Sequence, residues 1–139
     1  MTRVFIDTSA LFKRYVLEDG TDSLTEILSE ADEIAVSAIT RIEFHSALKR
    51  RLTENSFSIE SYQHIIREFH SDMNYFETIP FDLSIETIAI DLIQRLGMKS
   101  LDSIQLASAK ISNCEMMVVS DRQLFARAES ENFCKFRFI

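Results

Sequence analysis

Residues 3–11 read RVFIDTSAL, a short apolar run that ends at Asp7 and passes directly into a helical pattern. A run of this kind, rich in β-branched and aromatic residues, is typical of a strand buried on both faces of a sheet. Residues 116–124, MMVVSDRQL, have the same design, with an apolar run followed by Ser120 and Asp121 and then by another helical pattern. Both aspartates are therefore expected at the carboxyl ends of strands.

The alternation of short apolar runs with longer helical periods continues from end to end of the chain. Strands are expected at residues 3–6, 34–37, 76–79, 116–119 and 135–138. Helices are expected at residues 9–16, 22–29, 40–52, 59–73, 83–96, 101–111 and 122–130. This order predicts an α/β fold in which a central parallel β-sheet of about five strands is flanked by helices. Ligands bind such sheets at the carboxyl ends of the strands, where Asp7 and Asp121 are expected.

Size and composition limit the possible functions. The 139 residues, 46% of them hydrophobic, suffice for one core, so residues 1–139 are expected to form a single domain. Two glycines and one proline leave no glycine-rich phosphate loop or nucleophile elbow. No apolar run approaches the roughly 20 residues that a bilayer requires, so we expect a cytoplasmic protein without a membrane partner. Cys114 and Cys134 lack the spacing of a metal site and are expected to be reduced core residues.

The net charge of −7 disfavours binding to a polyanion, because affinity for phosphates comes mainly from lysine and arginine. This argument is weak where carboxylates surround a bound cation and local positive patches remain. Residues 49–51, Lys-Arg-Arg, form one such patch, which either contacts a phosphate backbone or simply suits the dipole at the end of a helix. Four further cations lie near the candidate acids in the sequence, and they either contact phosphate or balance local negative charge: Lys13, Arg14, Arg41 and Arg122.

Two more acids, Glu43 and Asp102, fall on expected helices and have no cation three or four residues further along. A carboxylate on an inward face is costly unless a charge meets it, so we expect a cation as its partner. Simpler interpretations remain open. Asp7 and Asp121 fit as helix N-caps, and Asp102 fits as an acid in the first turn of a helix capped by Ser100.

Together the four carboxylates form an oxygen-only ligand set, which selects hard cations such as Mg²⁺ or Mn²⁺. A cation of this kind lowers the pKa of a bound water and neutralises charge on a phosphate during in-line displacement. The sequence is compatible with one metal ion or with two.

Four segments resemble the successive motifs of PIN-domain ribonucleases, and closely resemble those of the VapC-type toxins. The segments are VFIDTSAL at 4–11, VSAITRIE at 36–43, LDSIQLASA at 101–109 and VVSDRQL at 118–124. They occur in the family's order and together span nearly the whole chain. Ser120 stands where many members have threonine, which preserves the hydroxyl group.

The resemblance implies a PIN-domain fold, endoribonuclease activity dependent on Mg²⁺ or Mn²⁺, homodimerisation, and inhibition by a cognate antitoxin. It assigns the family's acids to Asp7, Glu43, Asp102 and Asp121, and its neighbouring polar positions to Ser9 and Ser120. We therefore expect a divalent-metal-dependent endoribonuclease that hydrolyses RNA phosphodiester bonds as the toxin of a toxin-antitoxin pair.

Two alternatives fit parts of the pattern. A phosphoacceptor or phosphatase also has an aspartate after its first strand, but these sites need further acids where Thr8 and Ser9 stand here. The second alternative is a catalytically weak or inactive PIN-fold module that binds RNA or a protein partner without cutting. The three histidines share no motif with a nucleophile or an acid and are expected to be structural or exposed: His45, His64 and His70.

Overall fold

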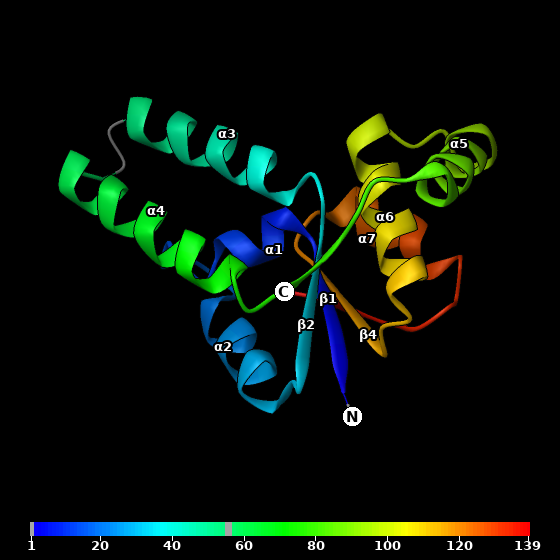
Figure 1. Ribbon diagram of the computed structural model, residues 1–139, viewed down its shortest axis with the longest axis horizontal. Coiled ribbons are helices and arrows are strands. Elements are labelled where there is room, and N and C mark those ends of the chain that lie inside the picture. The colour runs from blue at the N-terminus through cyan, green and yellow to red at the C-terminus, as the bar shows by residue number, and fades with distance from the viewer. Residues whose placement is uncertain (1, 55–56) are drawn as a thin grey trace.

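The computed structural model describes residues 2–54 and 57–139, which form five strands and seven helices. The strands are β1 (Arg3–Ile6), β2 (Glu33–Ser37), β3 (Glu77–Ile79), β4 (Met116–Val119) and β5 (Lys135–Phe138). The helices are α1 (Thr8–Phe12), α2 (Thr21–Glu30), α3 (Thr40–Thr53), α4 (Ile59–Met73), α5 (Leu83–Leu96), α6 (Ser100–Ser112) and α7 (Arg122–Glu129). All strand pairs are parallel, in the order β3-β2-β1-β4-β5, so the predicted fold class is confirmed (Figure 1). None of the helices in this part of the chain is both long and apolar enough to cross a bilayer.

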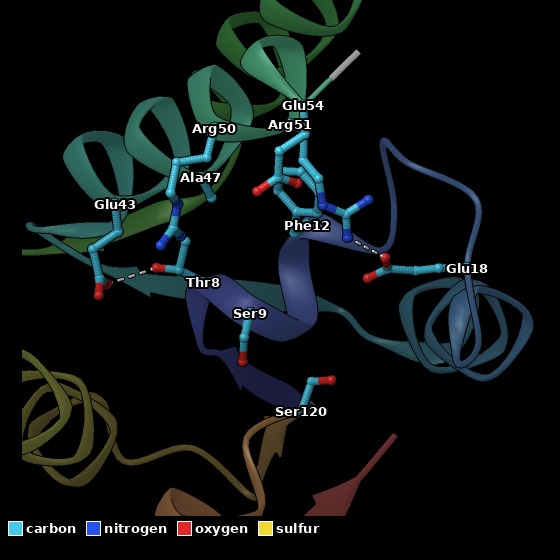
Figure 2. A pocket seen from close by; sticks show the side chains of 10 residues that line it. All are labelled: Thr8, Ser9, Phe12, Glu18, Glu43, Ala47, Arg50, Arg51, Glu54 and Ser120. Carbon is cyan, nitrogen blue, oxygen red and sulfur yellow. Dashed lines mark hydrogen bonds and ion pairs between the residues drawn. The ribbon is translucent and has the colours of Figure 1, made fainter. Parts of the chain in front are cut away.

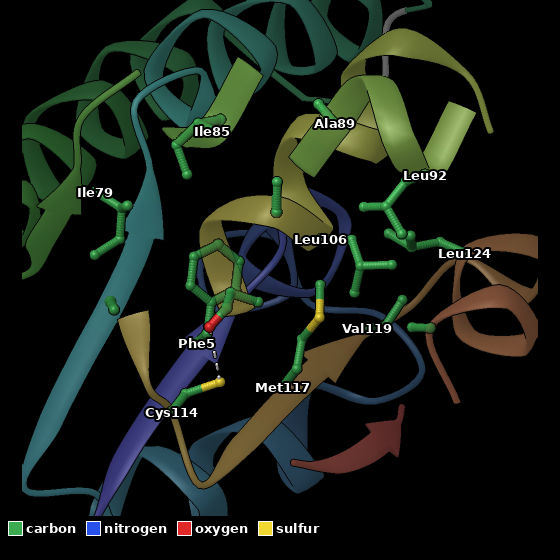
Figure 3. Packing of buried hydrophobic residues seen from close by; sticks show 14 of the residues in the cluster. Phe5, Ile79, Ile85, Ala89, Leu92, Leu106, Cys114, Met117, Val119 and Leu124 are labelled. Carbon is green, nitrogen blue, oxygen red and sulfur yellow. Dashed lines mark hydrogen bonds between the residues drawn. The ribbon is translucent and has the colours of Figure 1, made fainter. Parts of the chain in front are cut away.

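Side chains alternate between the two faces of the sheet, and each face has its own core. Phe5 and Met117 pack with Leu106 on the face covered by α5, α6 and α7 (Figure 3). Val118 packs on the opposite face, together with Phe44 of α3 and with residues of α1, α2 and α4. Figure 1 shows these two groups of helices on opposite sides of the sheet. Burial on both faces explains why β4 and residues 4–6 of β1 are continuous apolar runs in the sequence.

All but one of the expected elements begin and end within one residue of the observed bounds. The exception is the helix expected at 9–16, which ends at Phe12 as α1. Past this point the Lys13 N–H bonds to the carbonyl three residues back, in the manner of a 3₁₀ turn. The Lys13 ammonium donates to the Asp19 carbonyl at 2.6 Å, and the Thr21 hydroxyl donates to the Lys13 carbonyl at 2.8 Å. These bonds close a turn that ends the helix early.

The chain order of the strands reverses between β1 and β4. Strands β2 and β3 lie on one side of β1, whereas β4 and β5 lie on the other. The connections from the carboxyl ends of β1 and β4 diverge at such a reversal, which leaves a crevice for ligands. Asp7 follows β1 directly, and Asp121 lies two residues beyond β4. The fold thus brings both predicted strand-end acids to the reversal point.

Candidate active site

Asp7 is almost fully buried, with 4% of its surface exposed. Its N–H donates to the Val118 carbonyl at 3.1 Å, which continues the pairing of β1 with β4. Its side chain caps α1, because the Ala10 N–H donates to Oδ1 at 3.1 Å and the Ser9 hydroxyl donates to Oδ2 at 2.7 Å. The N-cap interpretation is therefore confirmed for Asp7, and Ser9 contacts this acid directly.

Burial raises the pKa of Asp7 to about 7, because the charged carboxylate has lost its water. The hydrogen bonds from Ser9 and Ala10 oppose this rise, whereas the negative charges of Glu43 and Asp102 add to it. A carboxyl group with a pKa near neutrality retains part of its protons at physiological pH. A positive charge placed among these acids would favour the ionised form, so the arrangement suits a bound cation.

Glu43 lies in the first turn of α3 and is half-buried. Its Oε1 accepts the Thr8 hydroxyl at 2.8 Å and the Gln105 amide Nε2 at 2.7 Å. The same amide nitrogen lies 2.9 Å from the Thr8 oxygen, so side chains from α1, α3 and α6 form one closed network. No lysine or arginine in the described part of the chain forms an ion pair with Glu43. Neutral donors hold this acid.

Asp102 lies in the first turn of α6, which begins at Ser100. The N-cap position is occupied by Lys99 without a side-chain hydrogen bond, so the interpretation of Ser100 as the cap is wrong. Ser100 is already helical, and its carbonyl accepts the Ser103 hydroxyl at 2.6 Å. Burial raises the pKa of Asp102, and the negative charge of Asp121 raises it further.

Asp121 is exposed and caps α7, because its Oδ1 accepts the Leu124 N–H at 2.8 Å. The N-cap interpretation is thus confirmed for this acid as well. Its charge acts on Asp102, and the charge of Asp102 acts in turn on Asp7. The four acids therefore form one electrostatic neighbourhood that extends from the buried Asp7 to the exposed Asp121.

This neighbourhood is not a closed metal cage. Among the described residues, no three His, Cys, Asp or Glu side chains converge closely enough to hold an ion unaided. Magnesium keeps several of its waters, however, and is commonly held by one or two carboxylates together with substrate phosphates. The donor chemistry of the four acids fits a hydrated Mg²⁺ or Mn²⁺ ion, and their mutual repulsion favours one.

A pocket of about 410 Å³ opens beside Glu43. Residues of α1, residues of α3 and Ser120 line it, and Figure 2 shows Ser120 on the side of the pocket opposite α3. The Ser9 hydroxyl also lines this pocket. The Ser120 hydroxyl donates to the Ile139 carbonyl at 3.1 Å, so its protein partner is a backbone group and not one of the acids. Of the four candidate acids, Glu43 lines the pocket, so a ligand in it would reach Glu43 directly.

Two arginines of the basic segment at the end of α3 also line this pocket (Figure 2). Arg51 is held by an ion pair with Glu18 at 2.7 Å and lies over the ring of Phe12 at 5.2 Å. Arg50 is exposed and forms no ion pair with any described residue. Arg50 is therefore the cation of the pocket that can meet a phosphate without breaking an existing contact.

Comparison with known proteins decides the family. The sequence model of the PIN domain matches residues 4–130. The chain belongs to the PIN-domain family. No curated protein sequence matches this one significantly.

Solved structures of toxin-antitoxin complexes share the fold of this PIN domain. FitAcB from Neisseria gonorrhoeae is 16% identical with a TM-score of 0.73, covering 96% of this chain and 96% of its own. VapBC2 from Rickettsia felis, bound to a DNA fragment from its promoter, is 17% identical with a TM-score of 0.69 over 99% of both chains. A toxin-antitoxin complex from Klebsiella pneumoniae is 21% identical with a TM-score of 0.67, covering 88% of this chain and 90% of its own. At these identities the similarity shows the fold alone.

Sequence reasoning about this PIN domain did not identify Thr8 and Gln105 as site residues. Thr8 stands where phosphatase-type sites need an acid, and Gln105 lies within the segment LDSIQLASA with no role of its own predicted. One signal was available. Gln105 stands among small and apolar residues in the segment SIQLASA at 103–109, and an amide on a helical face of this kind needs a partner when it is buried. The identity of that partner required the three-dimensional structure.

Other candidates have partners away from the acids. Four cations make contacts within the chain: Lys13 with Asp19 and Glu18, Arg14 with Asp72, Arg41 with Thr78, and Arg122 with the ring of Phe138. The histidines are structural or exposed as expected: His45 contacts His70 through the two Nε2 atoms at 3.2 Å, and His64 contacts Glu68 at 3.3 Å. Both cysteines are free thiols, as expected, with their sulfur atoms 3.8 Å apart: Cys114 and Cys134.

Proposed function

We propose that this PIN domain is a divalent-metal-dependent endoribonuclease that hydrolyses RNA phosphodiester bonds. The observation that carries the proposal is the buried Asp7, whose pKa is raised to about 7 by burial and by two neighbouring acids. A protein that only needed a helix cap would not place two further carboxylates near a buried one, because their repulsion destabilises the fold. Membership of the PIN-domain family supports the proposal, since such domains are typically metal-dependent nucleases.

The cofactor would be Mg²⁺, with Mn²⁺ as a substitute, held by Asp7, Glu43, Asp102 and Asp121. When bound, it supplies a lower pKa for the attacking water and charge neutralisation at the phosphate. Ser9 orients one oxygen of Asp7, and the network from Thr8 and Gln105 orients Glu43. Exposed Asp121 lies at the solvent side of the acids, where water enters.

The RNA strand would approach through the pocket beside Glu43. Arg50 lines this pocket and is the cation best placed for a backbone phosphate, because Arg51 is held by Glu18. One positive side chain beside four acids gives weak binding without a metal, since phosphate affinity depends on neutralised charge. RNA and metal are thus expected to bind together.

We also propose that the chain is the toxin of a toxin-antitoxin pair, acting in the cytoplasm as a homodimer and inhibited by a cognate antitoxin. Support comes from the matching structures, which are structures of toxin-antitoxin complexes. Light scattering of the purified protein should give twice the mass of one chain. Cleavage should stop when the chain is purified together with the protein encoded beside it. A monomer that is active alongside that neighbour would contradict this part of the proposal.

The direct test is cleavage of a panel of structured RNAs by protein freed of any partner, with Mg²⁺, with Mn²⁺ and with EDTA. Metal-dependent cleavage that is lost in both Asp7→Asn and Asp102→Asn would support the proposal. One observation favours the alternative of a PIN-fold module that binds without cutting: both Asp7 oxygens already accept hydrogen bonds. Metal binding without cleavage of any RNA would favour that alternative.

A further inference from the structure

The side chain of Gln105 lies at the centre of the site. It lies one helical turn after Asp102 on α6, and only 2% of its surface is exposed. Its Nε2 lies 2.7 Å from Glu43 Oε1, 2.9 Å from Thr8 Oγ1 and 3.5 Å from Thr40 Oγ1. The buried amide of Gln105 thus contacts two helices other than its own, through Thr8 of α1 and through Glu43 and Thr40 of α3.

The direction of each hydrogen bond in this network follows from the donors available. A carboxylate only accepts, so the Gln105 amide nitrogen and the Thr8 hydroxyl must both donate to Glu43 Oε1. The second amide hydrogen of Gln105 then goes to the Thr8 oxygen, whose own hydrogen is already committed. The opposite orientation of the amide would place its oxygen against the carboxylate. The negative charge of Glu43 therefore sets the orientation of Gln105.

This network has a consequence for the carboxylate. Both donors meet the same oxygen, Oε1, and no described residue donates to Oε2. The donors are neutral, so they fix the orientation of Glu43 without cancelling its charge. An arginine or lysine in the same place would orient the acid equally well and would compete with a metal cation for it. Neutral donors are the partners that keep an oriented carboxylate available to a cation.

The amide oxygen of Gln105 points to the same conclusion. It is buried and has no hydrogen-bond partner among the described residues. An unsatisfied buried acceptor destabilises a fold, and an apolar side chain of similar size would avoid that cost. A glutamine that served packing alone would be a poor choice here. The role that explains a glutamine here is the hydrogen bond from its amide nitrogen to Glu43.

We propose that Gln105 is a positioning residue of the acid site, which acts with Thr8 to fix Glu43 with one oxygen directed to the cation. This inference rests on the proposed metal-dependent function, but it is tested by metal binding without RNA. Residues that orient a metal ligand typically contribute about 10- to 100-fold to metal affinity. Gln105→Met and Thr8→Val are each expected to weaken Mn²⁺ binding by about this factor.

The experiment is calorimetric titration of the full chain with Mn²⁺, alongside denaturant unfolding in EDTA. Gln94→Met serves as the control, because Gln94 is exposed on α5, and Thr8→Ser should restore binding because it keeps the hydroxyl. The double variant should lose less than the product of the single losses, since both donors serve one oxygen. Gln105→Met should change stability little, because removal of the unpartnered oxygen offsets the loss of the hydrogen bonds to Glu43 and Thr8.

Two outcomes would overturn the inference. One is wild-type Mn²⁺ affinity in Gln105→Met and Thr8→Val, whatever their stability, which would make the network structural only. The other is the absence of Mn²⁺ binding by the wild type. Weakened binding in both variants, found together with a wild type that cleaves no RNA, would support the role of Gln105 and refute the nuclease proposal. If one variant fails to fold, the other still decides the result.

Discussion

Replacing Asp7 by asparagine should stabilise the metal-free protein at alkaline pH. The pKa of Asp7 is raised from 3.8 to about 7, chiefly by burial. The folded state therefore holds the proton more tightly than the unfolded state, and stability falls as the pH rises from about 4 to about 7. By linkage, ionisation of this one group lowers the free energy of unfolding by about 4 kcal/mol at pH 8. Asparagine is neutral at every pH and escapes this loss.

The substitution also has a cost. The single amide oxygen of asparagine can serve only one of the two groups that donate to Asp7, Ser9 and Ala10. A lost hydrogen bond costs about 1 kcal/mol, so a net gain of about 3 kcal/mol is expected at pH 8. The change of this stability difference with pH is the better test, because the lost hydrogen bond lowers the stability of the variant equally at every pH. Between pH 5 and pH 8 the advantage of the variant should grow by about 2.5 kcal/mol.

The assay is urea unfolding in EDTA at several pH values between 5 and 8, for the wild type, Asp7→Asn and Asp82→Asn. Asp82 is the matched control, since it caps α5 through the Ile85 N–H but is exposed. Its variant should track the wild type across the pH range. If Asp7→Asn is less stable than the wild type at pH 8 and the difference does not change with pH, burial of this carboxylate does not act as described.

Three further predictions follow from the site and its helices. Because a ligand must lose its proton, Mn²⁺ affinity should rise about tenfold per pH unit up to about pH 7 and then level off; calorimetry that finds no pH dependence would exclude Asp7 as a ligand. Arg50→Ala should weaken binding of single-stranded RNA and reduce its salt slope by about 0.7, while Lys110→Ala, which removes the same charge from an exposed position that does not line the pocket, should leave both unchanged. Ser58→Ala should lower the free energy of unfolding by about 1 kcal/mol because Ser58 caps α4, whereas Ser100→Ala should lower it little. Equal losses for the two variants in urea unfolding would contradict this assignment of the caps.

Much of the fold could be predicted because its central strands, β1 and β4, are buried on both faces. The runs at residues 4–6 and 116–119, which precede Asp7 and Asp121, are apolar at every position since each face of the sheet has its own helices. The two acids could be placed for the same reason, because a polar residue that ends such a run must lie at a strand end. The early end of α1 could not be predicted. It depends on a bond from the Lys13 ammonium to a backbone carbonyl six residues away, which no helical period records.

The acids on helices show which part of the site could not be predicted from the sequence. Glu43 could be recognised as unusual from local sequence, because the positions three and four residues away offer no cation. Its actual partners are 35 and 62 residues away in the chain, and both are neutral. Looking for a cation opposite Glu43 could not identify these partners. A carboxylate that binds a metal is best oriented by neutral donors, because they leave its negative charge intact. Gln105 lies three residues after Asp102, so one helix supplies both an acid and the donor that orients another acid. A lone amide on a buried helical face beside a candidate ligand is therefore a sequence feature that predicts a second ligand from a distant part of the chain.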